Sequence, residues 1–274
     1  MLGLTLLRVA PLALSGDEGG FQPPSIQDFF PPAIAFEGTF FQIDRIWIVR
    51  IITTIVLCTI FILAAKRAKL VPGRFQAGIE YLLEFVRVQI ADEILGIRAK
   101  RFVPMLSVIF FSILFFNITS IVPGLNIAGT SRIGLPLLLA LWVMARYWYE
   151  GIKKQKLGGY LKSSLFPPSV KDMPFLYLIV TPIEALQVFV IRPASLAIRL
   201  TANMIAGHIM LVLCFSATEF FLLHAAGPLK GFSAVTLAGG VFVTLFELLV
   251  GFLQAYIFAL LAAAYINMSL EEEH

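Results

Sequence analysis

The chain has 274 residues, of which 59% are hydrophobic and only 14% are charged, and its mean hydropathy is +0.88. A soluble domain carries about 25% charged residues, so this composition predicts an all-α polytopic membrane protein with about five membrane segments. The net charge of +4 does not indicate a nucleic-acid partner, because we expect the excess basic residues to lie in loops and set the topology. The two cysteines, Cys58 and Cys214, lie in apolar runs and predict neither a disulfide framework nor a metal site.

The N-terminal segment, residues 1–45, is expected to be extramembrane or interfacial. Residues 1–16 resemble a weak signal peptide, with a short apolar run that ends in small residues, although Arg8 interrupts that run. Two alternatives stay open for these residues, namely cleavage and an interfacial position on the non-cytoplasmic side. Residues 17–45 are rich in Pro, Gly, Phe and acidic residues, which is typical of irregular structure.

The first span is predicted at residues 46–65, and Lys66, Arg67 and Lys69 follow it directly. Basic residues flank spans on the cytoplasmic side, so the N-terminus is predicted to lie outside. Residues 72–95 carry apolar residues at steps of three and four, interrupted by several charges. This pattern predicts an amphipathic helix along the cytoplasmic surface rather than a span.

Residues 102–150 are predicted to form a hairpin of two spans that begins and ends beside basic cytoplasmic segments. The first of these spans covers about residues 102–122 and the second about residues 134–150. Near the end of the second span, we expect Arg146 and Glu150 to extend toward an interface.

Residues 174–223 are almost continuously apolar. As one helix they would be about 75 Å long, whereas the hydrocarbon core is about 30 Å thick. No polar turn divides them, so we expect one long helix that is tilted, or bent near Pro182 and Pro193. With the apolar segment after the loop at 224–231, residues 174–270 are predicted to form a long tilted helical hairpin. The acidic tail, residues 271–274, is expected in the cytoplasm, and the whole chain is one integral membrane domain.

Polar residues inside these apolar segments are the candidates for function. A charge at the centre of a bilayer costs roughly 2.5–3.5 kcal/mol on insertion scales, so such residues mark ion pathways by default. The candidates are Asn117, Glu184, Arg192, Arg199, Asn203, His208, Glu219, Glu247 and Gln254.

Spacing separates an arginine-bearing helix face from the positions of the titratable residues. Arg192, Arg199 and Asn203 are seven and four residues apart and share one helix face. His208 lies nine residues beyond Arg199, on the opposite side of an ideal helix. Glu247 and Gln254 are seven residues apart and share a face of the returning helix.

The arginine face and the titratable residues differ in the chemistry that they can perform. Arginine stays protonated at any physiological pH, so Arg199 is a fixed positive charge rather than a proton carrier. His208 and Glu247 can exchange protons with water. A relay of exchangeable groups that stops at a permanent cation suits a directional device with two half-channels, because the cation blocks a direct leak.

The segment around Arg199 carries a resemblance to a known family. Residues 192–208, RPASLAIRLTANMIAGH, resemble the signature segment of the a-subunit family of F-type rotary ATP synthases. Residues 246–258, FELLVGFLQAYIF, are similar to the final helix of that family. The resemblance covers about residues 70–270 and includes the amphipathic segment VPGRFQAGIEYLLEFV at 71–86 and the span at 104–124.

The family's functional positions can be matched residue by residue. Arg199 matches the essential arginine and Asn203 the asparagine that follows it. His208 and Glu247 match the two titratable positions, Gln254 matches a functional polar position, and Asn117 matches the asparagine of the span at 104–124.

The resemblance implies a fold of membrane helices that ends in a long tilted hairpin against a rotating c-ring. It implies that protons flow through two offset half-channels separated by Arg199, coupled to ring rotation and ATP synthesis. The implied partners are the c-ring, the peripheral-stalk b subunits and the bilayer, in the plasma membrane of a bacterium. No cofactor is expected, and without a Walker-type glycine-rich loop nucleotide chemistry is expected on another subunit. Proton and sodium transport are both compatible with these residues, and we favour protons.

The sequence also departs from the family pattern. Thr201-Ala202 stands where the family more often has Phe-Gly. Ser120 stands where many members carry an acid or glycine, and Glu184 lies one residue further from Pro193 than the family's glutamate.

Structural roles are the alternative for several candidates. Arg199 could pair with Glu184 or Glu219, and His208 could be a packed histidine. Asn117 and Gln254 could hold helices together. Glu219 could simply lie at the membrane interface, and Arg192 could contact the face of the c-ring or lipid head groups.

Two rival functions use the same residues. A free-standing secondary transporter would need a substrate cavity and no partner, but no internal repeat of the kind common in transporters is visible. An intramembrane enzyme would need a nucleophile or a metal set, and His208, His224 and Glu247 lack the spacing of one.

Overall fold

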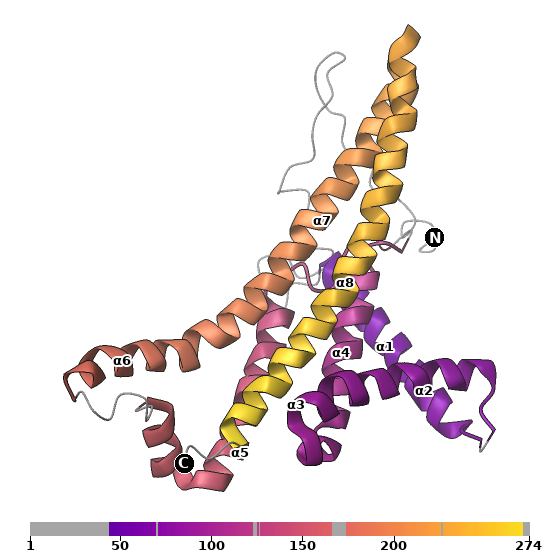
Figure 1. Cartoon of the computed structure of the whole chain (residues 1–274). Coiled ribbons are helices and arrows are strands. Elements are labelled where there is room, and N and C mark those ends of the chain that lie inside the picture. The colour runs from indigo at the N-terminus through magenta and orange to yellow at the C-terminus, as the bar shows by residue number, and fades with distance from the viewer. Residues whose placement is uncertain are drawn as a thin grey trace. The chain divides into compact units, whose positions relative to one another are not determined.

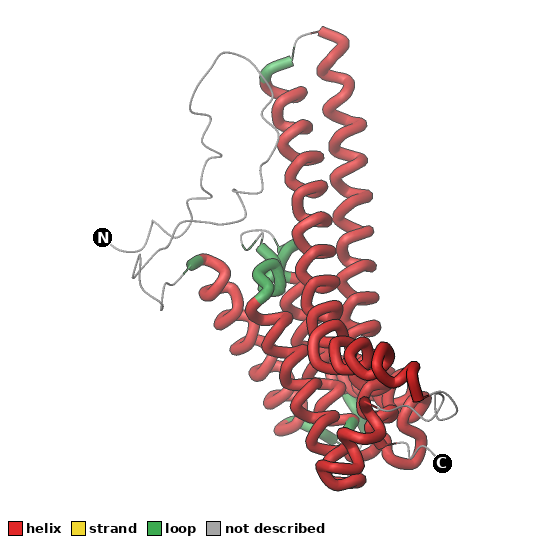
Figure 2. Tube along the Cα trace, turned by 90° about the vertical axis from the view of Figure 1, so that its left-hand side faces the viewer, coloured by secondary structure: helices red, strands yellow, loops and turns green. Residues whose placement is uncertain are grey.

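The computed structural model of the chain describes residues 44–69, 71–122, 125, 127–165, 174–225 and 227–270. Within these ranges all regular structure is helical, as the red segments of Figure 2 show. Three helical stretches, Arg45–Lys66, Val180–Leu223 and Gly227–Leu270, are long and apolar enough to cross a membrane, and Val103–Ile118 is a shorter apolar helix. The predicted all-α, polytopic class is thereby confirmed. Nearly all of the predicted segment 1–45 and the acidic tail 271–274 lie outside the described residues.

The elements follow one another as α-helices joined by short π- and 3₁₀-helical turns (Figure 1). In chain order they are α1 (Arg45–Lys66), α2 (Arg74–Val86), the π-helix η2 (Arg87–Asp92), α3 (Glu93–Leu95), the 3₁₀-helix η3 (Gly96–Arg101), α4 (Val103–Ile118), α5 (Gly134–Leu165), α6 (Pro174–Leu186), the π-helix η5 (Gln187–Ile191), α7 (Arg192–Leu223), the 3₁₀-helix η6 (Gly227–Gly231) and α8 (Phe232–Leu270).

The amphipathic segment predicted at 72–95 corresponds to α2, η2 and α3. Its apolar side chains Val86 and Ile90 are fully buried, whereas Glu80 and Glu84 are exposed. This helical stretch ends where Gly96 adopts a φ of +53°, a conformation that glycine reaches without steric penalty. A positive φ of +61° also occurs at Lys156, where α5 is kinked.

The long apolar segment contains no polar turn, but it does contain a π-helical turn at η5. Pro193 follows this turn closely and has no N–H to donate to the carbonyl of Phe189, and its ring crowds that carbonyl. The extra residue of a π-helical turn relieves such crowding. Backbone carbonyls in the turn that lose their helical N–H partner then need a hydrogen bond from another donor. The hydroxyl of Tyr147, from α5, donates a 2.9 Å hydrogen bond to the carbonyl of Val188 inside η5.

The described residues divide into two compact units. The first comprises the described parts of 1–53, 116–129 and 203–251. In it, α7 and α8 run side by side in opposite directions (Figures 1 and 2). The hydroxyl of Thr218 donates a 2.9 Å hydrogen bond to that of Thr236, and a β-carbon at Gly240 would lie 3.3 Å from the ring of Phe215. Small residues therefore let the two helices approach closely, as is common in membrane proteins.

The second unit comprises 54–115, 130–202 and 252–274, as far as they are described. Aromatic rings hold its helices together. The ring of Phe85 lies 5.9 Å from that of Phe110, 5.8 Å from that of Phe252 and 5.9 Å from that of Tyr256, measured between centroids. This cluster joins α2 to α4 and α8. Trp148 of α5 and Phe189 of η5 form a further edge-on pair at 5.0 Å.

Glu150 is enclosed within the second unit and does not extend outward as predicted. Its side chain is only 2% exposed, and its Oε1 lies 2.8 Å from Arg101 Nη2 and 3.1 Å from Arg146 Nη2. Both guanidinium groups also lie over the ring of Phe102, at 5.6 and 5.9 Å. Burying a carboxylate is tolerable when two cations neutralise it and donate hydrogen bonds to it.

Candidate functional site

Glu247 is a buried acid of the first unit. It is 3% exposed, and both carboxyl oxygens are shut off from solvent. A β-carbon built on Gly207 would lie 3.4 Å from its Cγ, so the backbone of α7 packs directly against this side chain. An acid enclosed in this way within an apolar helix can exchange a proton only through the polar groups that reach it.

Two polar residues at the end of α4 lie near this acid. The hydroxyl of Ser120 lies near the Glu247 carboxyl without a hydrogen bond to it, and it donates a 2.7 Å hydrogen bond to the carbonyl of Asn117. A hydroxyl has a single proton and can rotate to suit its neighbours, so Ser120 can turn that proton toward either acceptor. Sequence reasoning noted Ser120 only as a departure from the family pattern, and its position three residues after Asn117 was the signal available.

Asn117 connects α4 with α8. Its Nδ2 donates a 3.2 Å hydrogen bond to the carbonyl of Gly251, and the residue is 2% exposed. A β-carbon at Gly251 would lie only 3.2 Å from Asn117 Cβ, so the absence of a side chain there permits the contact. This geometry favours the role of interhelical glue for Asn117, one of the two alternatives that its sequence position left open.

His208 is half-buried on α7, immediately after Gly207. The charge of Arg45 acts on His208 electrostatically, so the first residue of α1 lies near this imidazole. Arg45 also donates a 3.0 Å hydrogen bond from Nη2 to the carbonyl of Leu125, which ties the start of α1 to the loop after α4. Sequence reasoning missed Arg45, because it lies at the edge of the predicted extramembrane segment and has no spacing relation to the other candidates.

Arg199 and Asn203 lie one helical turn apart on α7, and both are exposed. No ion pair or hydrogen bond of the Arg199 side chain is recorded within the described part of the chain, and no carboxylate there lies within 4.0 Å of its guanidinium. The structural alternative of a pair with Glu184 or Glu219 therefore has no support among these residues.

The remaining candidates occupy different environments. In the second unit, the guanidinium of Arg192 lies 5.2 Å from the ring centroid of Tyr265, Gln254 is 3% exposed, and Glu184 is half-buried. In the first unit, Glu219 is exposed. The cation–π contact of Arg192 is made within the chain, so it supports a packing role that differs from the contacts with the c-ring or with lipid head groups considered above.

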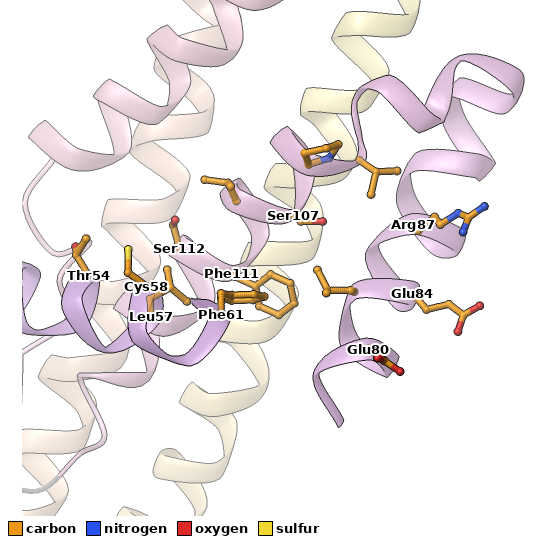
Figure 3. Close-up of a pocket in the computed structure, with 14 residues that line it drawn as sticks. Thr54, Leu57, Cys58, Phe61, Glu80, Glu84, Arg87, Ser107, Phe111 and Ser112 are labelled. Atoms are coloured by element: carbon orange, nitrogen blue, oxygen red, sulfur yellow. The ribbon is translucent and has the colours of Figure 1, made fainter. Parts of the chain in front are cut away.

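A separate cavity of about 870 Å³ lies in the second unit between α1, α2 and α4. Figure 3 shows Phe61 and Phe111 beside it, while the charged ends of Glu84 and Arg87 point away from it. Its walls are therefore apolar, and no charged group is aimed into it from these two positions. Among the described residues, no cluster of His, Cys, Asp and Glu could hold a metal ion.

Comparison with known proteins gives a consistent result. The family model for the ATP synthase A chain matches residues 47–267. The chain is 44% identical to the ATP synthase subunit a of Rhodococcus erythropolis over 263 residues, which cover 95% of this chain and 94% of that one. It is 35% identical to the corresponding subunit of Pseudarthrobacter chlorophenolicus over 94% of this chain and 96% of the relative, and 34% identical to that of Frankia alni over 95% and 90%. This protein therefore belongs to the ATP synthase A chain family, the a subunits of F-type ATP synthases.

Proposed function

We propose that this chain is the proton-translocating stator subunit of an F-type ATP synthase. Two offset half-channels separated by Arg199 deliver protons to and from the carboxylates of a c-ring and so couple proton flow to ring rotation and ATP synthesis. The transmembrane potential contributes about 2.3 kcal/mol per proton for each 100 mV. The observation that carries the proposal is an exposed arginine within a long apolar helix, with no acid of the described chain against it.

The surroundings of Arg199 suit an apolar partner that carries an acid. The exposed neighbours of Arg199 along η5 and α7 include Val190, Ile191 and Ile198. A desolvated guanidinium is stable on such a surface when a partner supplies the missing carboxylate. A ring of c subunits with one acid per subunit has the required chemistry, because each acid is ionised as it meets the cation and protonated again as it leaves.

The register of the α7–α8 hairpin supports a role for Gln254 beside the arginine. Gly207 faces Glu247, and Thr218 faces Thr236. Each step of one residue forward along α7 is therefore matched by one residue backward along α8. Continued along both helices, this antiparallel register pairs Gln254 with Leu200, the residue that follows Arg199. The amide of Gln254 can donate and accept hydrogen bonds, so it can orient the guanidinium or pass a proton through a bound water.

The groups of the first unit supply one half-channel. Glu247, with Ser120 and His208, forms a set of exchangeable groups within apolar helices. We place Asn203 and Glu219 along the same route as auxiliary polar positions. The peripheral-stalk b subunits hold the chain against the turning ring. From the basic residues after the first span we infer that the N-terminus lies outside and the C-terminus in the cytoplasm, with the chain in a bacterial plasma membrane.

The test replaces Arg199 in the assembled enzyme. In inverted membrane vesicles, Arg199→Ala is expected to abolish ATP synthesis driven by respiration while the subunits still assemble, because nothing then separates the half-channels. Arg199→Lys keeps a charge but loses the planar guanidinium and is expected to lose most of the activity. The matched control is Arg192→Ala, which removes an arginine seven residues earlier on the same face of α7. It is expected to leave ATP synthesis largely intact. Near wild-type synthesis in the Arg199→Ala vesicles would refute the proposal.

A further inference from the structure

A second cavity, of about 420 Å³, lies at the C-terminal end of α8 in the second unit. Its lining combines charged and apolar side chains from η3, from Phe102 between η3 and α4, and from the last turn of α8. The lining residues are Ile97, Arg98, Lys100, Arg101, Phe102 and Leu270. None of these residues belongs to the proposed proton path, and three of the six carry a positive charge.

Two of the three cations are held in place by the protein. Arg98 donates a 3.1 Å hydrogen bond from Nη1 to the carbonyl of Leu270. The same carbonyl also accepts a hydrogen bond from Lys154, which lies outside the lining. Arg101 is fixed by its 2.8 Å contact with the buried Glu150. Cations at the C-terminus of a helix satisfy its last carbonyls and complement its dipole. Arg98 and Arg101 are therefore oriented in advance of any ligand.

Lys100 differs from these two. It is exposed, and no hydrogen bond or ion pair of its side chain is recorded within the described residues. The cluster as a whole also has an excess of positive charge. Arg98, Lys100, Arg101 and Arg146 are four cations, and among the described residues Glu150 is the one carboxylate that contacts any of them. Such an excess attracts an anion.

The apolar half of the lining indicates what kind of anion fits. Ile97 is 104% exposed, as much as an isolated residue would be, while Phe102 and Leu270 also line the cavity but are buried. A free inorganic anion gains nothing from these side chains. A phospholipid gains from both halves, because its phosphate meets the cations while the start of its acyl chains covers Ile97.

We propose that this cavity binds the phosphate-bearing head group of an anionic phospholipid, with Lys100 as its principal cation and Arg98 and Arg101 as fixed neighbours. The site lies on the face that the positive-inside pattern assigns to the cytoplasm, where anionic lipids concentrate. A lipid held there would fill the hollow at the end of α8, the helix that carries Glu247. The proposal does not depend on the proton path, so either can fail without the other.

The test uses the full chain, purified in detergent, stripped of lipid and checked for helical content by circular dichroism. Short-chain phosphatidylglycerol, phosphatidylcholine of the same chain length and inorganic phosphate are the probes, and native mass spectrometry counts the bound molecules. Phosphatidylglycerol is expected to bind at least about ten-fold more tightly than phosphatidylcholine. Lys100→Gln should weaken phosphatidylglycerol binding about five-fold, the equivalent of about 1 kcal/mol for one basic residue. Lys66→Gln, which removes an exposed lysine outside the cavity, should leave it unchanged.

A further variant separates a lipid from a free anion. Ile97→Asn should weaken phosphatidylglycerol binding and leave any binding of inorganic phosphate as it was. Equal binding of the two lipids, or an unchanged affinity in Lys100→Gln, would overturn the proposal. The proposal would also be overturned if millimolar phosphate displaced phosphatidylglycerol and Ile97→Asn had no effect on binding. The cavity would then bind anions in general and not a lipid.

The chain's own acidic residues provide the last control. Glu271, Glu272 and Glu273 follow Leu270 in the sequence and could neutralise the cations in place of a lipid. Replacing all three by Gln should change phosphatidylglycerol binding by less than about two-fold if the lipid occupies the cavity. If only the neutralised variant bound phosphatidylglycerol, the cavity would belong to the tail and the lipid proposal would be wrong.

Discussion

Gly207 on α7 packs directly against the side chain of Glu247 on α8. A β-carbon at Gly207 would lie 3.4 Å from Glu247 Cγ, 3.5 Å from Cδ and 3.7 Å from Oε1. These are ordinary van der Waals distances, so one methyl group fits and a larger side chain does not. Because His208 follows Gly207 directly, the same contact sets how far the backbone of the histidine lies from the carboxyl.

Gly207 can be used to test that packing. Gly207→Ala should leave ATP synthesis near the wild-type level and raise helix stability by roughly 0.5–1 kcal/mol. Gly207→Val should displace the Glu247 side chain, at a cost of about 1–3 kcal/mol for overpacking, and reduce respiration-driven ATP synthesis in vesicles. The control is Gly78→Val on α2, where a β-carbon meets nothing within 4 Å. Equal loss in both valine variants would show that the effect is not specific to Glu247.

Glu247→Gln tests whether the buried carboxyl must exchange a proton. Glutamine keeps the shape and the polar atoms of the side chain but cannot take up or release a proton at physiological pH. ATP synthesis in vesicles is therefore expected to fall to background while the complex still assembles. Glu84→Gln is the control, because Glu84 is an exposed glutamate on α2, outside the proposed proton route, and it should retain most of the activity. Full activity in the Glu247→Gln vesicles would remove this residue from the proton path.

The broad architecture was predictable because long apolar runs have few structural options. A run such as residues 46–65 must satisfy its backbone hydrogen bonds internally, and a helix does so. The continuous helix at Val180–Leu223 was predictable because no polar turn divides this segment. Its 44 residues, at about 1.5 Å each, give a helix about 66 Å long. The burial of Glu247 and Gln254 on one side of α8 likewise agrees with their spacing of seven residues.

Contacts between segments far apart in sequence could not be predicted in this way. Periodicity says which face of a helix a residue occupies, but it does not say which residue of another helix lies opposite. Arg45 lies near His208, which is more than half of the chain away in sequence, and Ser120 lies near Glu247 from the turn that follows α4. Glu150 was misplaced for the same reason. Its two cations include Arg101, which lies 49 residues away, and a lone carboxylate at the end of a span is usually expected in water.

Asn117→Ala distinguishes structural from channel roles at the end of α4. The substitution removes the 3.2 Å hydrogen bond to the Gly251 carbonyl, and such interhelical bonds in membranes average about 0.6 kcal/mol. We expect a loss of about that size in the free energy of unfolding, measured by titration with sodium dodecyl sulfate, and little change in ATP synthesis per assembled complex. The matched control is Ser112→Ala, which removes a half-buried polar group earlier on the same helix. A strong loss of synthesis at unchanged stability would instead place Asn117 in the half-channel.

Tyr147→Phe tests the support of the π-helical turn that precedes Arg192 and Arg199. The change removes only the hydroxyl that donates 2.9 Å to the carbonyl of Val188, and both residues are buried, at 2% and 4% exposed. A buried carbonyl left without its donor costs about 1–3 kcal/mol, and we expect that loss in the free energy of unfolding. Tyr149→Phe, an exposed tyrosine two residues away, should cost less than about 0.5 kcal/mol. Because η5 sets the direction in which α7 leaves α6, ATP synthesis should also fall in Tyr147→Phe at temperatures below its unfolding transition. If Tyr147→Phe lost stability no more than Tyr149→Phe and kept full activity, the hydroxyl would not be what holds the turn.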